Sequence, residues 1–281
     1  MRDIIILVMA VSFSVFQVVT KKLYGEEDST NVYMFNLISI LASFIIFLII
    51  SRGKFTYNGK TMMYAVYYGI TYISALVFSL LAIENGSLAL STLIMSYSLI
   101  IPALYGVMFL GEKPTVFAVA GILLLVISLY MTNKAEKTNG ISATWIVYAA
   151  LSFVCNGACA TLQKIQQVAY RGKYISEFML TGLLAAAVIA ILTIFYRKKS
   201  WKISKSGIRY GAITGFLNGM GNLFIMMLAS SVPAVILYPV FSGGSIILTC
   251  IISLYFFREK LTKRQGVGVI FGIISIILLN L

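Results

Sequence analysis

The side chains that most often carry out catalysis are scarce in this sequence. Histidine is absent, and the nine acidic residues lie between apolar stretches or near their ends. The three cysteines are Cys155, Cys159 and Cys250, all inside apolar stretches. Cys155 and Cys159 share a helix face at i, i+4 spacing, but cysteine in such surroundings behaves as a small hydrophobe. The usual catalytic base and zinc ligand are missing, so we expect no enzyme, no cofactor and no metal site.

Uncharged polar and aromatic side chains inside the apolar stretches remain as groups that could contact a small molecule. Asn218 and Asn222 are spaced i, i+4 and therefore share one helix face. A buried amide needs a partner, which can be a ligand, water or a neighbouring helix. For each candidate, ligand binding and packing are equally good interpretations, except that packing is slightly favoured for the tyrosine stripe. The candidates are Gln17, Tyr68, Thr71, Tyr72, Tyr97, Asn156, Asn218, Asn222, Tyr238 and Ser242.

The composition predicts an all-α integral membrane protein. Sixty per cent of the 281 residues are hydrophobic and 11% are charged, whereas a soluble domain carries roughly 25% charged residues. The apolar residues form runs of about 20, the length that crosses a bilayer core as a helix. Most Lys and Arg residues fall in the short connections, where they would meet lipid headgroups. The net charge of +13 therefore indicates contact with membrane lipids, and we expect no nucleic-acid binding.

Regular polar breaks divide the chain into ten predicted transmembrane helices. The first apolar run is too long for a signal peptide and is predicted to be a permanent span. Most connections are short, which favours one compact bundle without a soluble domain. With ends uncertain by about two to four residues, the predicted spans are 3–22, 31–51, 62–83, 87–110, 115–132, 142–163, 175–196, 208–229, 233–257 and 264–281.

An internal repeat relates the two halves of the chain. At one constant offset, the pairs Glu112/Glu259, Thr115/Thr262, Gly121/Gly268 and Ser128/Ser275 align without a gap. Shared Leu or Ile would mean little in membrane helices, but a shared Glu-Lys-x-Thr turn with a glycine at the same distance is informative. We predict two five-helix repeats, residues 1–135 and 141–281. Because five is odd, the second repeat must be inverted relative to the first, an architecture typical of secondary transporters.

These motifs resemble the drug/metabolite transporter superfamily, in its ten-span branch of duplicated EamA-type domains. The fourth and ninth spans close on Gly111-Glu112-Lys113 and on Arg258-Glu259-Lys260, each followed by Thr and a helix that contains glycine. Pro102, inside the fourth span, also matches the family habit. The resemblance covers the whole chain and implies a small-molecule transporter. It implies a central cavity lined by spans 1, 3, 4, 6, 8 and 9, with spans 5 and 10 mainly packing.

Proline and glycine mark the places where helices are expected to bend or to approach closely. Pro102 removes the hydrogen bond to the Ser98 carbonyl, and Pro239 does the same to Val235, so both are candidate hinges. The pairs Gly215/Gly219 and Gly268/Gly272 have the spacing that lets helices pack closely. The second pair could equally support a homodimer.

Glu112 and Glu259 sit at turns just before helices. A carboxylate there stabilises the positive end of the helix dipole and can cap free amides. We therefore predict a structural role for both residues.

The predicted function is a facilitator or exporter of a small polar or amphipathic metabolite, such as an amino acid or amine, working by alternating access. No acidic residue lies at the middle of the first span, which disfavours proton antiport through a buried carboxylate. An alternative is exchange of phosphorylated or sugar-type metabolites, kept open by Lys21 and Lys164 near span ends. A non-transporting membrane sensor or assembly protein is a weaker alternative, because no segment is long enough for a soluble docking domain.

The orientation in the membrane has two conflicting indicators. An even number of spans puts both termini on the same side. The distribution of Lys and Arg favours termini outside by the positive-inside rule, whereas the family resemblance implies cytoplasmic termini. Following the resemblance, we expect a bacterial inner-membrane protein with both termini in the cytoplasm.

Overall fold

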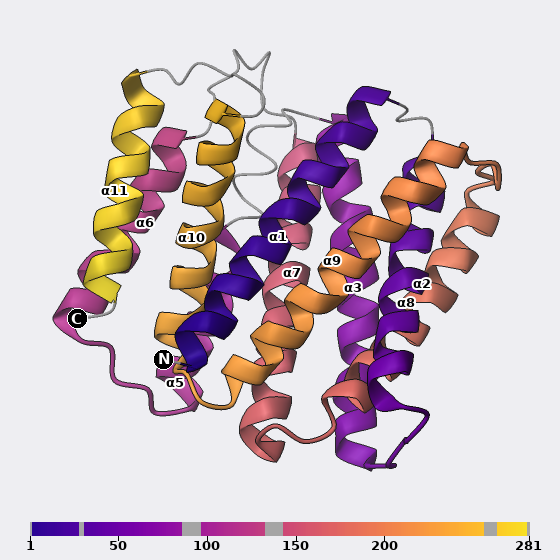
Figure 1. Cartoon of the computed structure of the whole chain (residues 1–281), viewed down its shortest axis with the longest axis horizontal. Coiled ribbons are helices and arrows are strands. Elements are labelled where there is room, and N and C mark those ends of the chain that lie inside the picture. The colour runs from indigo at the N-terminus through magenta and orange to yellow at the C-terminus, as the bar shows by residue number, and fades with distance from the viewer. Residues whose placement is uncertain (1, 28–30, 86–96, 133–142, 256–262, 280–281) are drawn as a thin grey trace. The chain divides into compact units, whose positions relative to one another are not determined.

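The computed structural model describes residues 2–27, 31–85, 97–132, 143–255 and 263–279. In these residues the chain is all-helical and contains no strand, in agreement with the predicted class (Figure 1). The helices are α1 (Arg2–Glu27), α2 (Val32–Ser51), α3 (Gly59–Asn85), α5 (Ile100–Phe109), α6 (Val116–Thr132), α7 (Ala143–Tyr170), α8 (Ile175–Tyr196), α9 (Lys205–Ala229), α10 (Ala234–Tyr255) and α11 (Lys263–Leu279).

Six of the described helices are long and apolar enough to cross a bilayer, namely α1, α2, α3, α7, α8 and α9. The remaining four contain shorter apolar segments. Large apolar side chains such as Ile49, Leu192 and Phe195 are well exposed on the spanning helices. Such surfaces are compatible with lipid, not with water, as their surroundings.

Several helices continue beyond their predicted ends. α1 extends to Glu27 and α7 to Tyr170, although the hydrophobic runs suggested ends at 22 and 163. The additional residues include Glu27, Gln166 and Gln167, which are polar but favour helix. Hydropathy therefore located the apolar part of each helix and missed the polar turns that continue it.

The described chain divides into two compact units, each of which combines helices from both predicted repeats. Unit 1 (residues 1–73 and 165–231) contains α1, α2, α8 and α9, with parts of α3 and α7. Unit 2 (74–164 and 232–281) contains α5, α6, α10 and α11, with the remaining parts of α3 and α7.

In unit 1, α9 packs against both α1 and α2, and α8 packs against α2 (Figure 1). The α2–α9 contact is built from serine and glycine. Ser39 Oγ donates to the Gly211 carbonyl at 2.9 Å, and Ser43 Oγ donates to the Gly215 carbonyl at 2.6 Å. A Cβ on Gly215 would collide with the Ser39 carbonyl oxygen, so glycine permits the close approach of the two backbones.

Polar contacts at both ends of α2 join this helix and its flanking residues to other parts of unit 1. Asn31 caps α2 by accepting from the Met34 N–H, and its amide donates to the Ser200 and Lys202 carbonyls. At the other end of α2, Glu177 accepts from the Thr56 N–H at 3.3 Å. The α8–α9 connection therefore lies at the start of α2, and the start of α8 lies near its end.

In unit 2, α6 lies along α11, and α10 contacts α5, α6 and α11 (Figure 1). Two reciprocal hydrogen bonds join α6 to α11. Ser128 Oγ donates to the Gly268 carbonyl at 2.6 Å, and Ser275 Oγ donates to the Gly121 carbonyl at 2.7 Å. Ser128 and Ser275 are one pair of the internal repeat, and Gly121 and Gly268 are another. In both directions, therefore, the serine of one helix donates to the equivalent glycine carbonyl of the other helix.

Candidate functional site

A break in the helical backbone precedes α5. Tyr97 is helical, Ser98 and Leu99 form a turn, and α5 follows. The Ser98 carbonyl accepts from the Ile101 N–H at 3.0 Å. Pro102 lies in the first turn of α5, where a missing amide hydrogen removes no hydrogen bond of the helix. In the part of the fourth predicted span that the structure describes, the proline therefore follows a helix interruption and does not bend a continuous helix.

α7 lies directly against this break. Asn156 Nδ2 donates to Ser98 Oγ at 2.7 Å, and the Ser98 side chain is fully buried. A Cβ on the next residue, Gly157, would lie only 2.8 Å from the Ser98 carbonyl oxygen. Glycine thus lets α7 approach the broken backbone. Asn156 supplies a polar partner where an unpaired hydroxyl would cost free energy.

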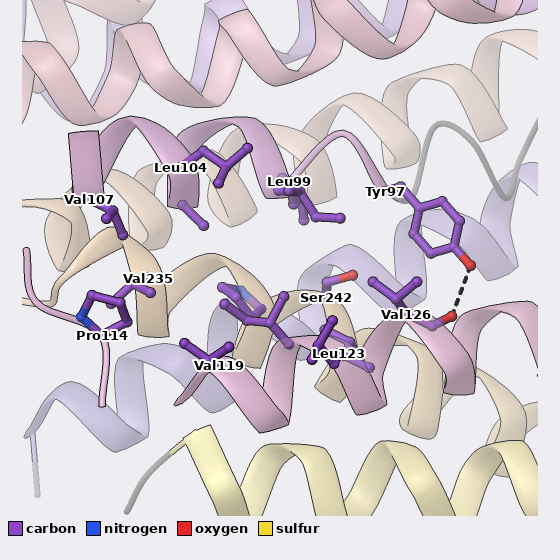
Figure 2. Close-up of a pocket in the computed structure, with 15 residues that line it drawn as sticks. Tyr97, Leu99, Leu104, Val107, Pro114, Val119, Leu123, Val126, Val235 and Ser242 are labelled. Atoms are coloured by element: carbon purple, nitrogen blue, oxygen red, sulfur yellow. Dashed lines mark hydrogen bonds between the residues drawn. The ribbon is translucent and has the colours of Figure 1, made fainter. Parts of the chain in front are cut away.

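The residues before and after Ser98 line an apolar pocket of about 260 Å³ between α5, α6 and α10 (Figure 2). The Tyr97 hydroxyl donates to the Val126 carbonyl at 2.9 Å, as the dashed line in Figure 2 shows. Pro239 and Ser242 enter the pocket from α10. The side chains that line it are Tyr97, Leu99, Ile100, Ala103, Leu104, Val107, Pro114, Val119, Ile122, Leu123, Leu125, Val126, Val235, Pro239 and Ser242.

In unit 1, Tyr72, Asn218 and Asn222 form a hydrogen-bonded group, the amide cluster. The Tyr72 hydroxyl donates to Asn218 Oδ1 at 3.3 Å. Asn222 Nδ2 donates to Asn218 Oδ1 at 3.2 Å and to the Asn218 carbonyl at 2.9 Å. All three side chains are half-buried. The i, i+4 spacing predicted the shared face of the two asparagines, and the structure adds Tyr72 to them.

Gln17 is half-buried on α1, and its side chain makes no hydrogen bond in the described part of the chain. It lies one turn from Phe13, whose ring packs on Phe224 of α9 with centroids 5.6 Å apart. Gln17 therefore shares the helix face that α1 turns toward α9. Thr71 is satisfied within its own helix, because its hydroxyl donates to the Tyr67 and Tyr68 carbonyls.

Two of the candidate tyrosines, Tyr68 and Tyr238, are buried between helices. Tyr68 is 1% exposed, stacks on Tyr72 and contacts Phe178 of α8. Tyr238 is also 1% exposed, and its hydroxyl donates to the Ala160 carbonyl at 2.9 Å. The candidates thus divide between the units, with Gln17, Tyr68, Thr71 and the amide cluster in unit 1, and Tyr97, Asn156, Tyr238 and Ser242 in unit 2.

A largely buried ion pair joins the α5–α6 turn to α7 and α10. Glu112 accepts from the Ala234 N–H at 2.8 Å through Oε1 and from the Val235 N–H at 3.0 Å through Oε2. Lys164 Nζ lies 3.4 Å from Glu112 Oε1 and donates to the Val232 carbonyl at 2.7 Å. The carboxylate thus caps the start of α10, where its negative charge also interacts favourably with the positive end of the helix dipole.

Glu112 therefore serves α10 and not the helix that follows it in the chain. At the start of that helix, Thr115 Oγ1 accepts from the Ala118 N–H at 3.0 Å. Glu259, the repeat equivalent of Glu112, lies outside the described residues.

Sequence reasoning missed Ser98 as the partner of Asn156 and missed the contribution of α6 to the pocket. The resemblance implied that the fifth span mainly packs, yet Val119 and Leu123 of α6 line the pocket. A glycine directly after Asn156 was a local signal for close approach of another backbone at this point. The lining by α6 carries no such signal, because its residues are ordinary aliphatic side chains.

The two cysteines of α7 form no disulfide in the described part of the chain. Cys155 is half-buried and Cys159 is buried. Among the described residues, no group of three or more Cys, Asp or Glu side chains lies close enough to hold a metal ion.

The helical fold and the long apolar helices are those of a membrane protein. The chain belongs to the EamA-like transporter family, whose pattern matches residues 1–134 and 143–281. Family membership and the relative below both indicate a transporter and not an enzyme, as expected from the sequence.

A curated relative is the multidrug resistance protein EbrA of Bacillus licheniformis (strain ATCC 14580). It is 30% identical over 106 residues, which are 37% of this chain and 93% of EbrA. A solved crystal structure of another protein is similar over 98% of both chains, with a TM-score of 0.81 and 11% sequence identity. At that identity the structural likeness concerns the fold alone.

Proposed function

We propose that the protein is a secondary transporter that exports a small polar or amphipathic metabolite, such as an amino acid, an amine or a related compound. The observation that carries the proposal is the helix break at Ser98–Leu99 with Asn156 bonded to Ser98. Discontinuous helices commonly form the substrate sites of secondary transporters, because their free backbone groups and helix ends can bind polar ligands. In this mechanism the Asn156 amide and the Ser98 hydroxyl exchange their mutual hydrogen bond for bonds to the substrate.

Alternating access follows from two five-span repeats of inverted topology. The reciprocal bonds Ser128–Gly268 and Ser275–Gly121 support this arrangement, because a twofold relation between the repeats requires matched contacts in both directions. The central cavity would be lined by spans 1, 3, 4, 6, 8 and 9. Pro102, beside the break, and Pro239, inside α10, are the positions at which these helices would bend.

Several observations support a substrate of this class. EbrA is named a multidrug resistance protein, which favours export of amphipathic compounds. The alternative of a phosphorylated substrate needs a free cation. Lys164 is not free, because it is bonded to Glu112 and to the Val232 carbonyl, so this alternative would depend on Lys21. Without an acidic residue at the middle of the first span, facilitation or exchange is the simpler mode of coupling.

Counterflow in proteoliposomes tests the proposal. Vesicles loaded with unlabelled amino acids or amines receive the labelled compound outside, without an ion gradient. We expect accumulation above that of protein-free vesicles, reduced by Asn156→Ala roughly 2- to 10-fold, the worth of one hydrogen bond. Asn36→Ala is the matched control, because Asn36 of α2 makes no side-chain hydrogen bond in the described part of the chain. Absence of accumulation for every solute, also with an imposed proton gradient, would overturn the proposal.

The proposed orientation places both termini in the cytoplasm of a bacterial cell. Single cysteines at Ser200 and Asn58, in a background without the native cysteines, test it with a membrane-impermeant thiol reagent. Only the cysteine at Ser200, in the α8–α9 connection, should react in intact cells. Reaction only at Asn58, in the α2–α3 connection, would reverse the orientation.

The proposal includes a homodimer, but the glycine pairs do not support it. Gly215 and Gly219 face Ser39 and Ser43 of α2, and Gly272 faces Ser128 of α6. These glycines are used in packing within the chain, so a dimer would need another surface.

A further inference from the structure

The pocket between α5, α6 and α10 is apolar, with two hydroxyl groups in its lining. The Tyr97 hydroxyl is already used, because it donates to the Val126 carbonyl. The Ser242 hydroxyl makes no hydrogen bond within the described part of the chain. The pocket therefore offers a bound molecule apolar contact on all sides and a single polar group, as Figure 2 shows for Ser242 among Leu123, Val126 and Leu99.

Part of the pocket lining is exposed on the surfaces of α5 and α6. Three of its lining residues are well exposed, Leu104 at 54%, Val119 at 45% and Leu123 at 61%. In a membrane protein, large exposed aliphatic side chains on a helix contact lipid. A molecule dissolved in the bilayer can thus reach the pocket sideways, without passing through water.

The charge of the lining limits which molecules can bind. No charged side chain is among the residues that line the pocket. The nearby carboxylate of Glu112 is fully engaged by Lys164 and the first amides of α10. Because transfer of an unpaired ion into apolar surroundings is very costly, cations and anions are excluded and neutral molecules are favoured.

We propose that this pocket is a binding site for neutral lipophilic molecules that carry one hydroxyl or carbonyl group and enter from the bilayer. Their polar group bonds to Ser242 Oγ, and their apolar body fills the space between Leu104, Val119 and Pro239. At about 30 Å³ for each water-sized group, the volume accommodates a body of roughly nine heavy atoms. An eight-carbon alcohol has this size and chemistry.

Photolabelling of the full-length protein in phosphatidylcholine nanodiscs tests the site. The probe is 3-azioctanol, a neutral eight-carbon alcohol with a photoreactive diazirine, and labelled residues are mapped by mass spectrometry. We expect saturable labelling of pocket residues on α5, α6 and α10, competed by octan-1-ol. Octylammonium has the same chain with a charged head and should not compete.

Two variants test the geometry of the pocket. Ala103→Leu fills it and should reduce saturable labelling roughly ten-fold, equivalent to about 1.4 kcal/mol. Ala120→Leu adds the same atoms at an exposed position of α6 outside the pocket and should leave labelling unchanged. Ser242→Ala should weaken the apparent affinity for octan-1-ol roughly 2- to 10-fold, the worth of one hydrogen bond.

The outcome is decided by binding alone and does not depend on the proposed transport. Labelling that does not saturate, or that Ala103→Leu and Ala120→Leu change equally, would overturn the site. Competition by octylammonium as strong as that by octan-1-ol would overturn the restriction to neutral molecules. If Ala103→Leu lowers the folded yield, Ser242→Ala and the competition series carry the test, because they add no atoms.

Discussion

The amide cluster of unit 1 and the apolar pocket of unit 2 differ in whether their polar side chains are hydrogen-bonded. In the amide cluster, Tyr72, Asn218 and Asn222 bond to one another. In the pocket, one hydroxyl is bound to the backbone and that of Ser242 is unpaired in the described part of the chain. Polar groups in lipid gain most from partners inside the protein. A group that remains unpaired next to a cavity is therefore the better indicator of a ligand.

The two regions also differ in the helices that build them. The asparagines of the amide cluster sit on α9, an uninterrupted helix held close to α2 by Ser39 and Ser43. The pocket lies beside a helix break and next to Pro239 inside α10. Close glycine–serine packing gives a fixed surface, whereas broken and proline-containing helices leave space. Binding is therefore expected where packing is interrupted.

The largest effect is expected from Lys164→Met, which leaves Glu112 as an uncompensated, largely buried charge. Removal of one partner of a buried pair costs about 3–5 kcal/mol, measured as unfolding free energy in nanodiscs. Because Glu112 holds Val235, which lines the pocket, saturable labelling by 3-azioctanol should fall as well.

The exposed Lys60 provides the control for that variant, because Lys60→Met removes a charge without a buried partner. Adding Glu112→Gln to Lys164→Met should restore part of the stability, since the glutamine is uncharged. Wild-type stability of Lys164→Met would show that the ion pair does not hold the pocket together.

Gly215→Ala is expected to disturb the unit of the amide cluster. The added methyl group would collide with the Ser39 carbonyl oxygen, and overpacking of this kind costs about 1–3 kcal/mol. Gly266→Ala serves as the control, because a Cβ there has no atom within 4 Å. Equal unfolding free energies for the two variants would contradict the close α2–α9 approach.

Asn218→Ala removes the shared acceptor of the amide cluster. Hydrogen bonds between membrane helices are worth about 0.6 kcal/mol each and at most about 1.7 kcal/mol, so a small loss of stability is expected. If the cluster only packs, counterflow should match that of Asn36→Ala. A fall in counterflow that exceeds the loss of folded protein would instead assign substrate contact to the amide cluster.

The smallest effects are expected from Ser128→Ala and Ser275→Ala. Each removes one of the reciprocal bonds between α6 and α11, at a cost of about 0.6 kcal/mol. Under a twofold relation the two variants should lose the same stability within error. Clearly unequal losses would argue against matched contacts.

Local sequence patterns were sufficient for the helices and for some shared faces. The apolar runs located every helix that the structure describes, and i, i+4 spacing put Asn218 and Asn222 side by side. These features depend on backbone geometry over one or two turns. The ends of α1 and α7 were missed because polar residues that favour helix continue a helix beyond its apolar part.

Long-range partners were outside the reach of sequence reasoning. Glu112 accepts from the first amides of α10, and which helix a carboxylate caps depends on how the chain folds back. The bond from Asn156 to Ser98 and the burial of Tyr68 against Phe178 likewise join residues of different helices. Spacing along the chain contains no information on these distances.

By itself, the sequence determined that this protein is an all-helical membrane protein with a repeated Glu-Lys-x-Thr motif, because bilayer thickness and helix geometry act on each segment separately. Only the tertiary structure decided which polar groups satisfy one another and where an apolar pocket remains beside a free hydroxyl. Both outcomes depend on the packing of side chains from three or more helices, and that packing exists only once the helices have assembled.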